Sequence, residues 1–334
     1  MHELLASLEE DEAAKLRREA PPQWASPMLA TLTENASSDP QWLYERKFDG
    51  IRCLAHSRSG TPILYSRNRR RLDGSYPELV EALAAQAIGR SILDGEVVAF
   101  EHKRTSFARL QGRSGIHDAE RARASGIAVY YYLFDLLYFD GYDLRNLPLR
   151  RRKAILRKVL RFRDPLRYSA HRNRDGEAWR AEACRRGWEG LIAKKADSPY
   201  VGRRSPDWRK LKCVRQQEFV IGGFTEPRGS RHGFGALLLG YYERGKLRCA
   251  GRVGSGFDEL QLRKLHAQLL RQERRSPAFV DERASRHGVH WVEPALVAEI
   301  AFTEWTRDGR LRHPRFLGLR EDKEAREVRR ERPT

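Results

Sequence analysis

The pattern of apolar and polar positions divides the chain into three stretches. Residues 3–18 alternate apolar and charged positions at helical spacing, which predicts a short amphipathic helix. From residue 42 to about 213, runs rich in β-branched and aromatic side chains alternate with helical runs. After Cys213 the pattern changes to several short strands joined by Gly-rich turns, with one long helix. This last pattern predicts a small barrel of the OB type, an architecture that often binds nucleic acids.

The same pattern assigns individual elements. The strands expected before Cys213 are Trp42–Glu45, Ile51–Ala55, Pro62–Tyr65, Ile92–Phe100 and Val129–Tyr138, and the helices are Pro77–Ala87, Leu149–Phe162, which has a basic face, and Gly176–Arg186. The strands expected after it are Glu218–Phe224, Ala236–Glu243, Lys246–Val253 and Ala298–Thr306, around a helix at Asp258–Arg275. The expected boundaries are 1–26 for the helix and linker, 27–213 and 214–323 for two domains, and 324–334 for a charged tail that forms a frayed helix or solvated end.

The length of the chain indicates the number of domains, and its charge indicates a class of binding partner. The chain has 334 residues, more than one hydrophobic core usually organises, which supports two domains. The formal net charge is +19 and the pI is about 10.1, so a polyanion is favoured as partner, most often nucleic acid. An Arg-rich proteome would produce the same charge without such a partner.

Cysteine usage and hydropathy suggest a compartment. The four cysteines, Cys53, Cys184, Cys213 and Cys249, lie far apart and form no Cys-x-x-Cys pair. This spacing argues against a zinc site or a disulfide framework and fits a reducing cytosol, with each cysteine in a core. No apolar run approaches the roughly 18–20 residues of a membrane helix, and the acidic N-terminus differs from a targeting peptide. We therefore expect a soluble, intracellular protein.

The candidate chemistry is concentrated in the segment Glu45-Arg46-Lys47-Phe48-Asp49-Gly50-Ile51-Arg52. A strand enters a tight turn that displays a lysine, a carboxylate and a glycine, and a second strand leaves with an arginine. A lysine is a nucleophile only as a neutral amine, which burial, nearby cations such as Arg52 or a bound metal can favour. Gly50 permits a positive φ or the close approach of a ligand. Taken alone, the segment also fits a basic hairpin with Asp-Gly at its turn.

Further motifs follow this segment in a fixed order, and together they resemble those of a known protein family. Lys47–Arg52 resembles the KxDGxR signature of the covalent nucleotidyltransferases, which include ATP-dependent DNA ligases, RNA ligases and mRNA capping enzymes. The later matches are Ser66-Arg67-Asn68, Leu93-Asp94-Gly95-Glu96, Tyr132-Leu133-Phe134-Asp135, Glu189–Lys194 (EGLxxK), Trp208–Lys212 and Arg312–Lys323. The sequence that flanks these motifs is similar to the ligase domain of bacterial end-joining ligases. The resemblance implies an α+β fold, in which an adenylation (nucleotidyltransferase) domain of mixed and antiparallel sheets precedes an OB-fold domain.

The resemblance also implies a role for each matched residue. Lys47 is the nucleophile that forms lysyl-AMP from ATP, and Arg67 grips the 5′-phosphate at a DNA break. Glu96 and Glu189 hold Mg²⁺ or Mn²⁺, and Arg320 and Lys323 orient the pyrophosphate. The residues expected to bind the nucleotide are Glu45, Arg52, Glu96, Phe134, Lys194, Lys210 and Lys212. Lys210 and Lys212 stand two apart, so a strand would point both to one face. His171, His232 and His313 have no metal-like spacing and are expected to be surface or packing residues.

The function that follows is sealing of breaks in duplex DNA, in repair or end joining. The multifunctional relatives also carry polymerase and phosphoesterase domains, for which 334 residues leave no room. Expected partners are nicked or broken duplex DNA and, by analogy, Ku and a separate end-processing polymerase, with the chain itself a monomer in the bacterial cytoplasm. The alternatives are an RNA ligase or capping-type nucleotidyltransferase, which adduct formation from ATP or GTP would separate, and a non-catalytic DNA-binding module.

Overall fold

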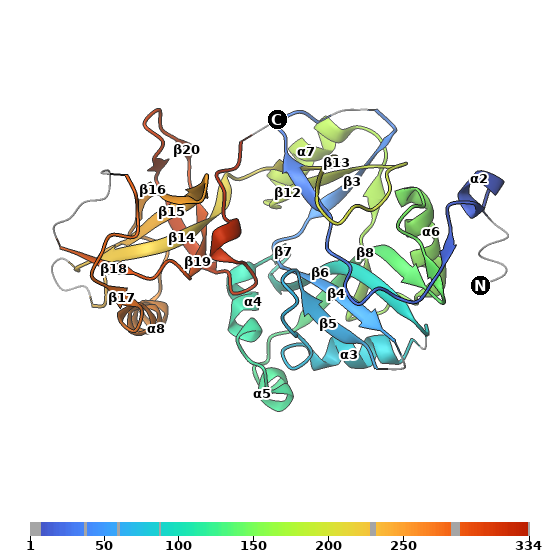
Figure 1. The fold of residues 1–334 in the computed structure, drawn as a ribbon, viewed down its shortest axis with the longest axis horizontal. Coiled ribbons are helices and arrows are strands. Elements are labelled where there is room, and N and C mark those ends of the chain that lie inside the picture. The colour runs from blue at the N-terminus through green and yellow to red at the C-terminus, as the bar shows by residue number, and fades with distance from the viewer. Residues whose placement is uncertain are drawn as a thin grey trace. The chain divides into compact units, whose positions relative to one another are not determined.

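The computed structural model describes residues 8–36, 39–58, 61–86, 88–227, 232–281 and 288–332. The chain forms two compact units, and the division falls between Cys213 and Val214 (Figure 1). The first unit contains two sheets, and the second contains one main sheet with a small hairpin. No helix in these ranges is long and apolar enough to span a membrane.

The larger sheet of the first unit has the strand order β1-β9-β8-β6-β4-β5, with β10 paired to β8 and β7 paired to β6. Its strands are β1 (Arg17–Arg18), β4 (Ile51–Ser57), β5 (Ile63–Ser66), β6 (Ser91–Glu101), β7 (Arg104–Thr105), β8 (Val129–Phe139), β9 (Tyr142–Asp143) and β10 (Leu166–Tyr168). Alternate side chains of β4, β6 and β8, among them Cys53, Val97 and Tyr131, form one core with the helices. The opposite face of these strands carries Arg52, Glu96 and Tyr132, which are register neighbours.

The smaller sheet of this unit has the order β11-β3-β12-β13-β2. Its strands are β2 (Leu29–Leu32), β3 (Trp42–Lys47), β11 (His171–Arg172), β12 (Gly190–Lys195) and β13 (Arg204–Lys212). The consecutive strands β3 and β4 therefore belong to different sheets. The basic-hairpin alternative for the lysine segment is wrong, because the turn after Lys47 carries the chain from one sheet to the other.

Five helices of the first unit are interspersed with its strands along the chain. They are α3 (Pro77–Ala84), α4 (Phe107–Ser114), α5 (Ala119–Ala124), α6 (Leu149–Val159) and α7 (Gly176–Arg185). Helix α6 packs against β8, and α7 packs against β12. The basic face expected on α6 does not point wholly to solvent, because Arg152 and Lys153 are both buried. Helices α4 and α5 were missed because they are short, with eight and six residues, and show little apolar periodicity.

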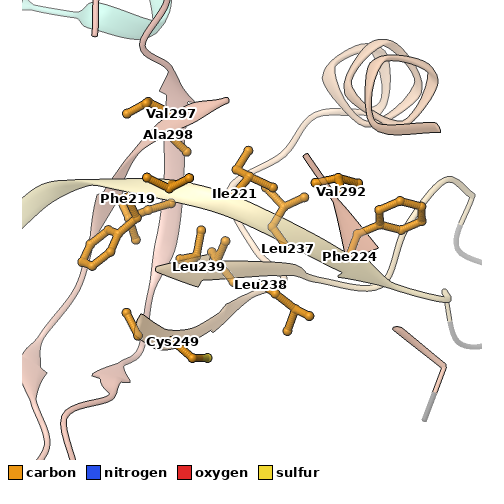
Figure 2. Close-up of a cluster of buried hydrophobic side chains, with 14 of the residues drawn as sticks. Phe219, Ile221, Phe224, Leu237, Leu238, Leu239, Cys249, Val292, Val297 and Ala298 are labelled. Atoms are coloured by element: carbon orange, nitrogen blue, oxygen red, sulfur yellow. The ribbon is translucent and has the colours of Figure 1, made fainter. Parts of the chain in front are cut away.

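The second unit is built around the long strand β14, which pairs with β15, β18 and β19. Its elements are β14 (Gln216–Thr225), β15 (Leu237–Glu243), β16 (Lys246–Val253), α8 (Glu259–Leu270), β17 (Glu273–Arg274), β18 (Val289–Val292), β19 (Val297–Ala301), β20 (Glu304–Trp305), β21 (Leu311–Arg312), β22 (Arg315–Leu319) and the short 3₁₀ helix η1 (Ala325–Glu327). Figure 2 shows its core, where Phe219, Ile221 and Phe224 of β14 meet side chains of β15, β18 and β19. Helix α8 starts after Asp258, whose side chain accepts from Gln261 N–H in a capping box.

Three predictions about the chain's periphery are wrong. Of the helix expected at 3–18, residues 3–7 lie outside the described residues, and the rest forms only α2 (Glu10–Ala13), because Arg17 and Arg18 pair with β9 instead. The strand expected at Ala298–Thr306 is split into β19 and β20, which pair with different partners. The tail after Lys323 is packed rather than solvated, since Val328 is buried and its carbonyl accepts from Tyr242 N–H.

The expectation that no cysteine forms a disulfide is also wrong. Cys184 and Cys213 are bonded, with their Cα atoms 5.1 Å apart. Cys184 lies at the end of α7 and Cys213 follows β13, and α7 packs on β12, the neighbour of β13. Packing thus brings together two residues that are 29 positions apart in the sequence. Cys53 and Cys249 form no disulfide and are buried, as expected for core residues.

Candidate active site

One face of the smaller sheet gathers most of the residues singled out by their motifs. Glu45 of β3 pairs with Ile192 of β12, which pairs with Lys210 of β13. Residues directly opposite each other share a face, and so do residues two apart on a strand. The register therefore puts the side chains of Glu45, Lys47, Lys194, Trp208, Lys210 and Lys212 on one face. The other face, with Tyr44, Leu191 and Ala193, forms a core with Trp179 and Ala183 of α7.

Lys47 ends β3, and its ammonium forms an ion pair with Glu189 Oε1. Backbone pairing of Lys47 with Gly190 brings Glu189 to this position. The lysine side chain is 19% exposed and the glutamate only 7%, so the pair lies at a partly open site. Gly190 has φ +151°, and a Cβ there would lie 2.0 Å from the Leu211 carbonyl oxygen, which explains the glycine of the EGLxxK motif.

The turn after Lys47 is fixed by its own carboxylate and glycine. The Asp49 carboxylate accepts from Phe107 N–H at 3.1 Å, and Asp49 N–H donates to Thr105 Oγ1 at 3.2 Å. A Cβ on Gly50 would lie 2.3 Å from the Val97 carbonyl oxygen and 3.0 Å from Glu96 Cγ. Gly50 is thus required for the close approach of strand β6 rather than of a ligand. The same packing places Glu96 against the turn that displays the lysine.

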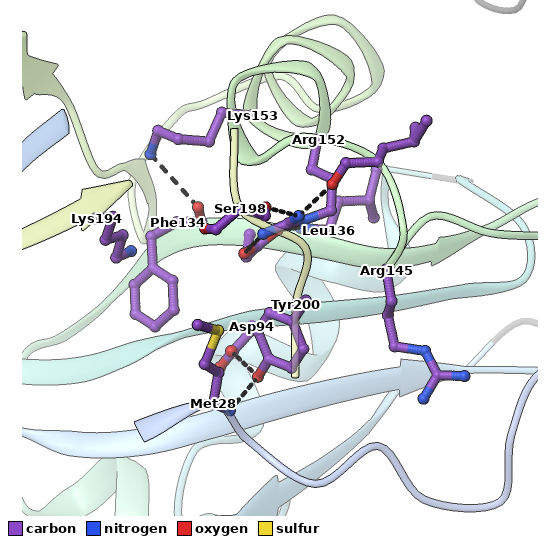
Figure 3. Close-up of polar contacts among 12 residues, drawn as sticks. Met28, Asp94, Phe134, Leu136, Arg145, Arg152, Lys153, Lys194, Ser198 and Tyr200 are labelled. Atoms are coloured by element: carbon purple, nitrogen blue, oxygen red, sulfur yellow. Dashed lines mark hydrogen bonds and ion pairs between the residues drawn. The ribbon is translucent and has the colours of Figure 1, made fainter. Parts of the chain in front are cut away.

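Arg52, at the start of β4, is held by a carboxylate to which the motif analysis assigned no role. Its Nε and Nη2 atoms donate to the two oxygens of Asp94, each at 2.5 Å. Tyr200 donates its hydroxyl proton to Asp94 Oδ2 at 2.6 Å and accepts from Met28 N–H at 2.9 Å (Figure 3). Burial by itself would lower the pKa of Arg52, but Asp94 outweighs burial and raises it. Arg52 is therefore a fixed cation.

The Phe134 ring is contacted by two cations and by the indole of a tryptophan. The Arg52 guanidinium carbon is 4.7 Å from its ring centroid, and Lys194 Nζ is 3.9 Å from it. Trp208 meets the same ring edge-on at 6.0 Å, and its indole Nε1 is buried with no hydrogen-bond partner among the described residues. Figure 3 shows Lys194 beside the Phe134 ring. An aromatic face flanked by cations and an unsatisfied donor suits a nucleotide base and its phosphates.

Glu45 is the hub of a buried polar network. Lys153 Nζ donates to its Oε1 at 2.8 Å, while Ser169 Oγ and Lys194 Nζ donate to Oε2 at 2.7 and 3.1 Å. Burial would raise the pKa of Glu45, but the two ammonium groups outweigh it and lower that pKa to about 2. Burial lowers the pKa of Lys194 to about 8 although Glu45 opposes the shift. The network holds two cations on one carboxylate.

The other predicted site residues are divided between the two units. Lys210 and Lys212 are half-buried on the face just described, as predicted for a strand. Arg67 follows Ser66, which pairs with Cys53 beside Arg52. Arg320 and Lys323 belong to the second unit, where Arg320 pairs with Asp322 and Glu299 and Lys323 pairs with Glu218. Burial would lower the pKa of Arg320, but Asp322 outweighs it and raises that pKa.

A divalent metal can be tested against the oxygen atoms of the site. Glu189 Oε2 is buried and has no hydrogen-bond partner within the described ranges. Glu96 packs against the same lysine turn from the larger sheet. Hard carboxylate oxygens are the ligands that Mg²⁺ and Mn²⁺ prefer, so these two residues fit such an ion. The described residues contain no group of three or more His, Cys, Asp and Glu placed to hold a metal without help from a substrate.

Comparison with known families now decides what this site is. Residues 27–212 match the family model described as ATP dependent DNA ligase domain, and residues 230–323 match the ATP dependent DNA ligase C terminal region. This chain belongs to the ATP-dependent DNA ligases. The ligase match over the first unit includes every motif residue from Glu45 to Lys212, and the second match includes Arg320 and Lys323.

Individual relatives show which ligases of this family the chain is similar to. The multifunctional non-homologous end joining protein LigD of Pseudomonas aeruginosa is 43% identical over 320 residues, covering 93% of this chain and 37% of its own length. LigD of Mycobacterium tuberculosis is 37% identical over 320 residues, covering 92% of this chain and 40% of its own length. The ligase chain thus spans about 40% of these curated relatives.

A solved structure confirms the fold of this ligase. The mycobacterial DNA ligase D complexed with ATP and MES is similar with a TM-score of 0.65 and 36% identity, covering 92% of this chain and 98% of that one. The predicted α+β architecture, an adenylation domain of mixed and antiparallel sheets followed by an OB-fold domain, is therefore confirmed.

Motif analysis missed three residues of the ligase site. Asp94, which anchors Arg52, stands inside the quoted Leu-Asp-Gly-Glu motif but received no role. Lys153 and Ser169, which contact Glu45, belong to no quoted motif and come from α6 and from the end of β10. Lys153 lies on the apolar side of the amphipathic helix α6, and this position could have indicated that it is buried. The many other basic residues of α6 hide that indication.

Proposed function

We propose that this chain seals breaks in duplex DNA through a lysyl-AMP intermediate on Lys47. The observation that carries the proposal is the position of Lys47, at the end of β3, on the sheet face that also bears Glu45, Lys194 and Lys210. Cations of β12 and β13 therefore share a sheet face with one partly exposed amine, which pairs with a carboxylate able to take up its proton. Transfer of nucleotidyl groups depends chiefly on such positioning and charge stabilisation.

The reaction would proceed in three balanced steps. Lys47 Nζ attacks the α-phosphorus of ATP, so that an N–P bond forms and the bond to pyrophosphate breaks. The AMP group then passes to an oxygen of the DNA 5′-phosphate, which frees Lys47. Finally the 3′-hydroxyl oxygen attacks that 5′-phosphorus and gives up its proton to solvent, so that a phosphodiester bond forms and the bond to AMP breaks.

Each side chain receives a part in these steps. Phe134 offers its ring to adenine, Glu45 and Arg52 orient the nucleoside, and Lys194, Lys210 and Lys212 neutralise the phosphate oxygens. Glu96 and Glu189 would hold Mg²⁺ or Mn²⁺, which when bound supplies further positive charge to the phosphates. Arg67 would contact the 5′-phosphate at the break. Arg320 and Lys323 would orient pyrophosphate, which requires their present ion pairs to open.

The biological setting we propose is double-strand break repair by end joining. The two LigD relatives carry non-homologous end joining in their names and align with most of this chain. Ku and an end-processing polymerase are the partners proposed for this role. A ligation assay with nicked, cohesive and blunt duplexes, with and without Ku, separates a general nick sealer from an end-joining enzyme.

The adenylation chemistry is tested by mass spectrometry of the protein after incubation with ATP and a divalent metal. We expect a mass increase of one AMP, located on Lys47, and no adduct with GTP alone. Lys47→Ala should abolish the adduct and retain DNA binding, whereas Lys195→Ala, an exposed lysine at the end of β12, should leave the adduct unchanged. An adduct on another side chain, or one formed from GTP alone, would contradict the proposal.

A further inference from the structure

Two cations contact the Phe134 ring, and they are held very differently. Arg52 is fixed by both oxygens of Asp94, a carboxylate that is fully buried and is itself bound by Tyr200. Lys194 hydrogen-bonds to a single carboxylate among the described residues, Glu45 Oε2 at 3.1 Å, and that carboxylate is shared with Lys153 and Ser169. The ammonium of Lys194 lies 3.9 Å from the Phe134 centroid and 4.3 Å from that of Trp208.

This position creates a conflict with nucleotide binding. An adenine ring stacked on Phe134 needs a ring face at van der Waals distance, where the Lys194 ammonium now lies. Lys194 and Phe134 are 2% and 7% exposed, so space for a base opens only when a side chain moves. Lys194 has the weaker anchorage of the two cations, and its buried charge is poorly stabilised, as its lowered pKa of about 8 shows. A phosphate offers that ammonium a better partner.

Moving Lys194 away from Glu45 would expose a second problem. A buried carboxylate that loses its counter-ion is costly, because desolvation strongly disfavours an unpaired charge. Lys153 solves this problem, since it is only 1% exposed and lies 2.8 Å from the other oxygen of the same carboxylate. It also donates to the carbonyl oxygen of Ser169 at 3.0 Å. A further hydrogen bond, to the carbonyl oxygen of Phe134 at 3.4 Å, is drawn in Figure 3. It is therefore held in place whether or not Lys194 stays.

We propose that Lys194 covers the Phe134 ring until a nucleotide binds, and that Lys153 is the positioning residue which lets Lys194 leave. Lys153 and Ser169 keep Glu45 ionised and neutralised, so Lys194 can exchange Glu45 for a nucleotide phosphate. This inference rests on the proposed nucleotide site and deepens it. Lys153 does not touch the nucleotide. It acts through Glu45, and its effect falls on nucleotide entry rather than on bond formation.

The test measures AMP uptake by Lys47 in single turnovers over a range of ATP concentrations, normalised to the uptake at saturation. Lys153→Met leaves Lys194 as the remaining lysine counter-ion of Glu45, so we expect the half-saturating ATP concentration to rise about tenfold or more, the scale of one charge-assisted hydrogen bond. The maximal rate should fall much less. Lys153→Arg should restore the wild-type value to within about threefold, because a guanidinium also neutralises Glu45.

Arg152→Met is the matched control. Arg152 is the neighbouring residue on α6, is equally buried and pairs with Asp135 instead of Glu45. It should destabilise the fold without a selective change in half-saturating ATP. Ser169→Ala removes a neutral donor from Glu45 Oε2, the oxygen that also accepts from Lys194. This variant should shift half-saturating ATP in the same direction by about threefold, which gives a readout if Lys153→Met does not fold.

Two results would overturn the inference, and they are distinguishable. If Lys153→Met and Ser169→Ala match Arg152→Met in half-saturating ATP, the network is structural and does not control entry. If Lys194→Met and Phe134→Ala also leave adenylation unchanged, the proposed nucleotide site itself is wrong. A selective shift in the Glu45-linked variants, together with rescue by Lys153→Arg, supports it.

Discussion

The Asp94–Arg52 pair offers the sharpest test of how this ligase positions a cation beside Phe134. Asp94→Asn keeps the shape of the side chain but removes its charge. The aspartate accepts two hydrogen bonds from Arg52 at 2.5 Å and one from Tyr200 at 2.6 Å. An asparagine has one acceptor oxygen, so one N–H of Arg52 must face the amide NH₂ group, which is itself a donor.

The expected loss can be worked from burial. Asp94 is 0% exposed and Arg52 17% exposed, so the variant leaves a largely buried guanidinium without its counter-ion. Breaking a buried pair in this way costs about 3–5 kcal/mol of unfolding free energy. The comparison is Asp143→Asn, in a pair where Arg145 is 33% exposed and water can replace the partner. We expect about 1 kcal/mol for that variant.

The assay must report on the first unit alone, because the chain has two compact units and need not unfold in one step. Hydrogen exchange of peptides from β4 and β6, followed through a urea series, meets that need. Tyr200→Phe, which keeps the ion pair but loses the hydroxyl, should fall between the two asparagine variants. If Asp94→Asn costs no more than Asp143→Asn, the buried pair does not hold Arg52, and the fixed-cation argument fails.

Three further predictions concern stability and DNA binding. Replacing both Cys184 and Cys213 by serine should lower the unfolding free energy of the first unit by about 3–4 kcal/mol, from closure of a 29-residue loop; unchanged stability, or two free thiols in the native protein, would exclude the disulfide. Glu45 has a folded pKa of about 2 against 4.5 unfolded, so it contributes stability above pH 4.5 that is lost as pH falls towards 2, about 3 kcal/mol in all. Glu45→Gln should flatten that acid limb in pH-dependent urea unfolding, and an unaltered limb would assign it to other carboxylates. Affinity for nicked duplex should fall steeply with salt if backbone phosphates dominate binding, and a flat response in a binding titration would show that the net charge is not used on DNA.

Local sequence patterns predicted this fold well where the elements are long and regular. The strands around Lys47 and the helix at Leu149 follow the expected periodicity. The pattern could not show that β3 and β4 join different sheets, because a strand's partners depend on contacts distant in sequence. The Cys184–Cys213 bond was missed for the same reason, since it depends on α7 packing over the small sheet.

The same limit applies to the site: local sequence identifies motif residues, but it does not show which residues distant in sequence contact each other. Motif spacing identified Lys47, Glu189 and Lys194, but it carries no information on which acid holds which cation. Lys153 illustrates the gap. In a chain with 64 lysines and arginines, one more lysine on a basic helix predicts a solvated face. Only the burial of that lysine against Glu45 shows otherwise.

Asp94 and Glu45 hold the two cations that contact Phe134, but they bind different numbers of cations, and this difference has a mechanistic consequence. Within the described residues, Arg52 is the one lysine or arginine that hydrogen-bonds to Asp94. If Arg52 moved away, the buried Asp94 carboxylate would lose its counter-ion. Glu45 serves two lysines, so one of them can leave at much lower cost. A pocket with one fixed and one exchangeable cation can keep its shape while it admits a nucleotide. Asp94→Asn should therefore act mainly on stability, whereas Lys153→Met should act mainly on the ATP concentration needed for adenylation.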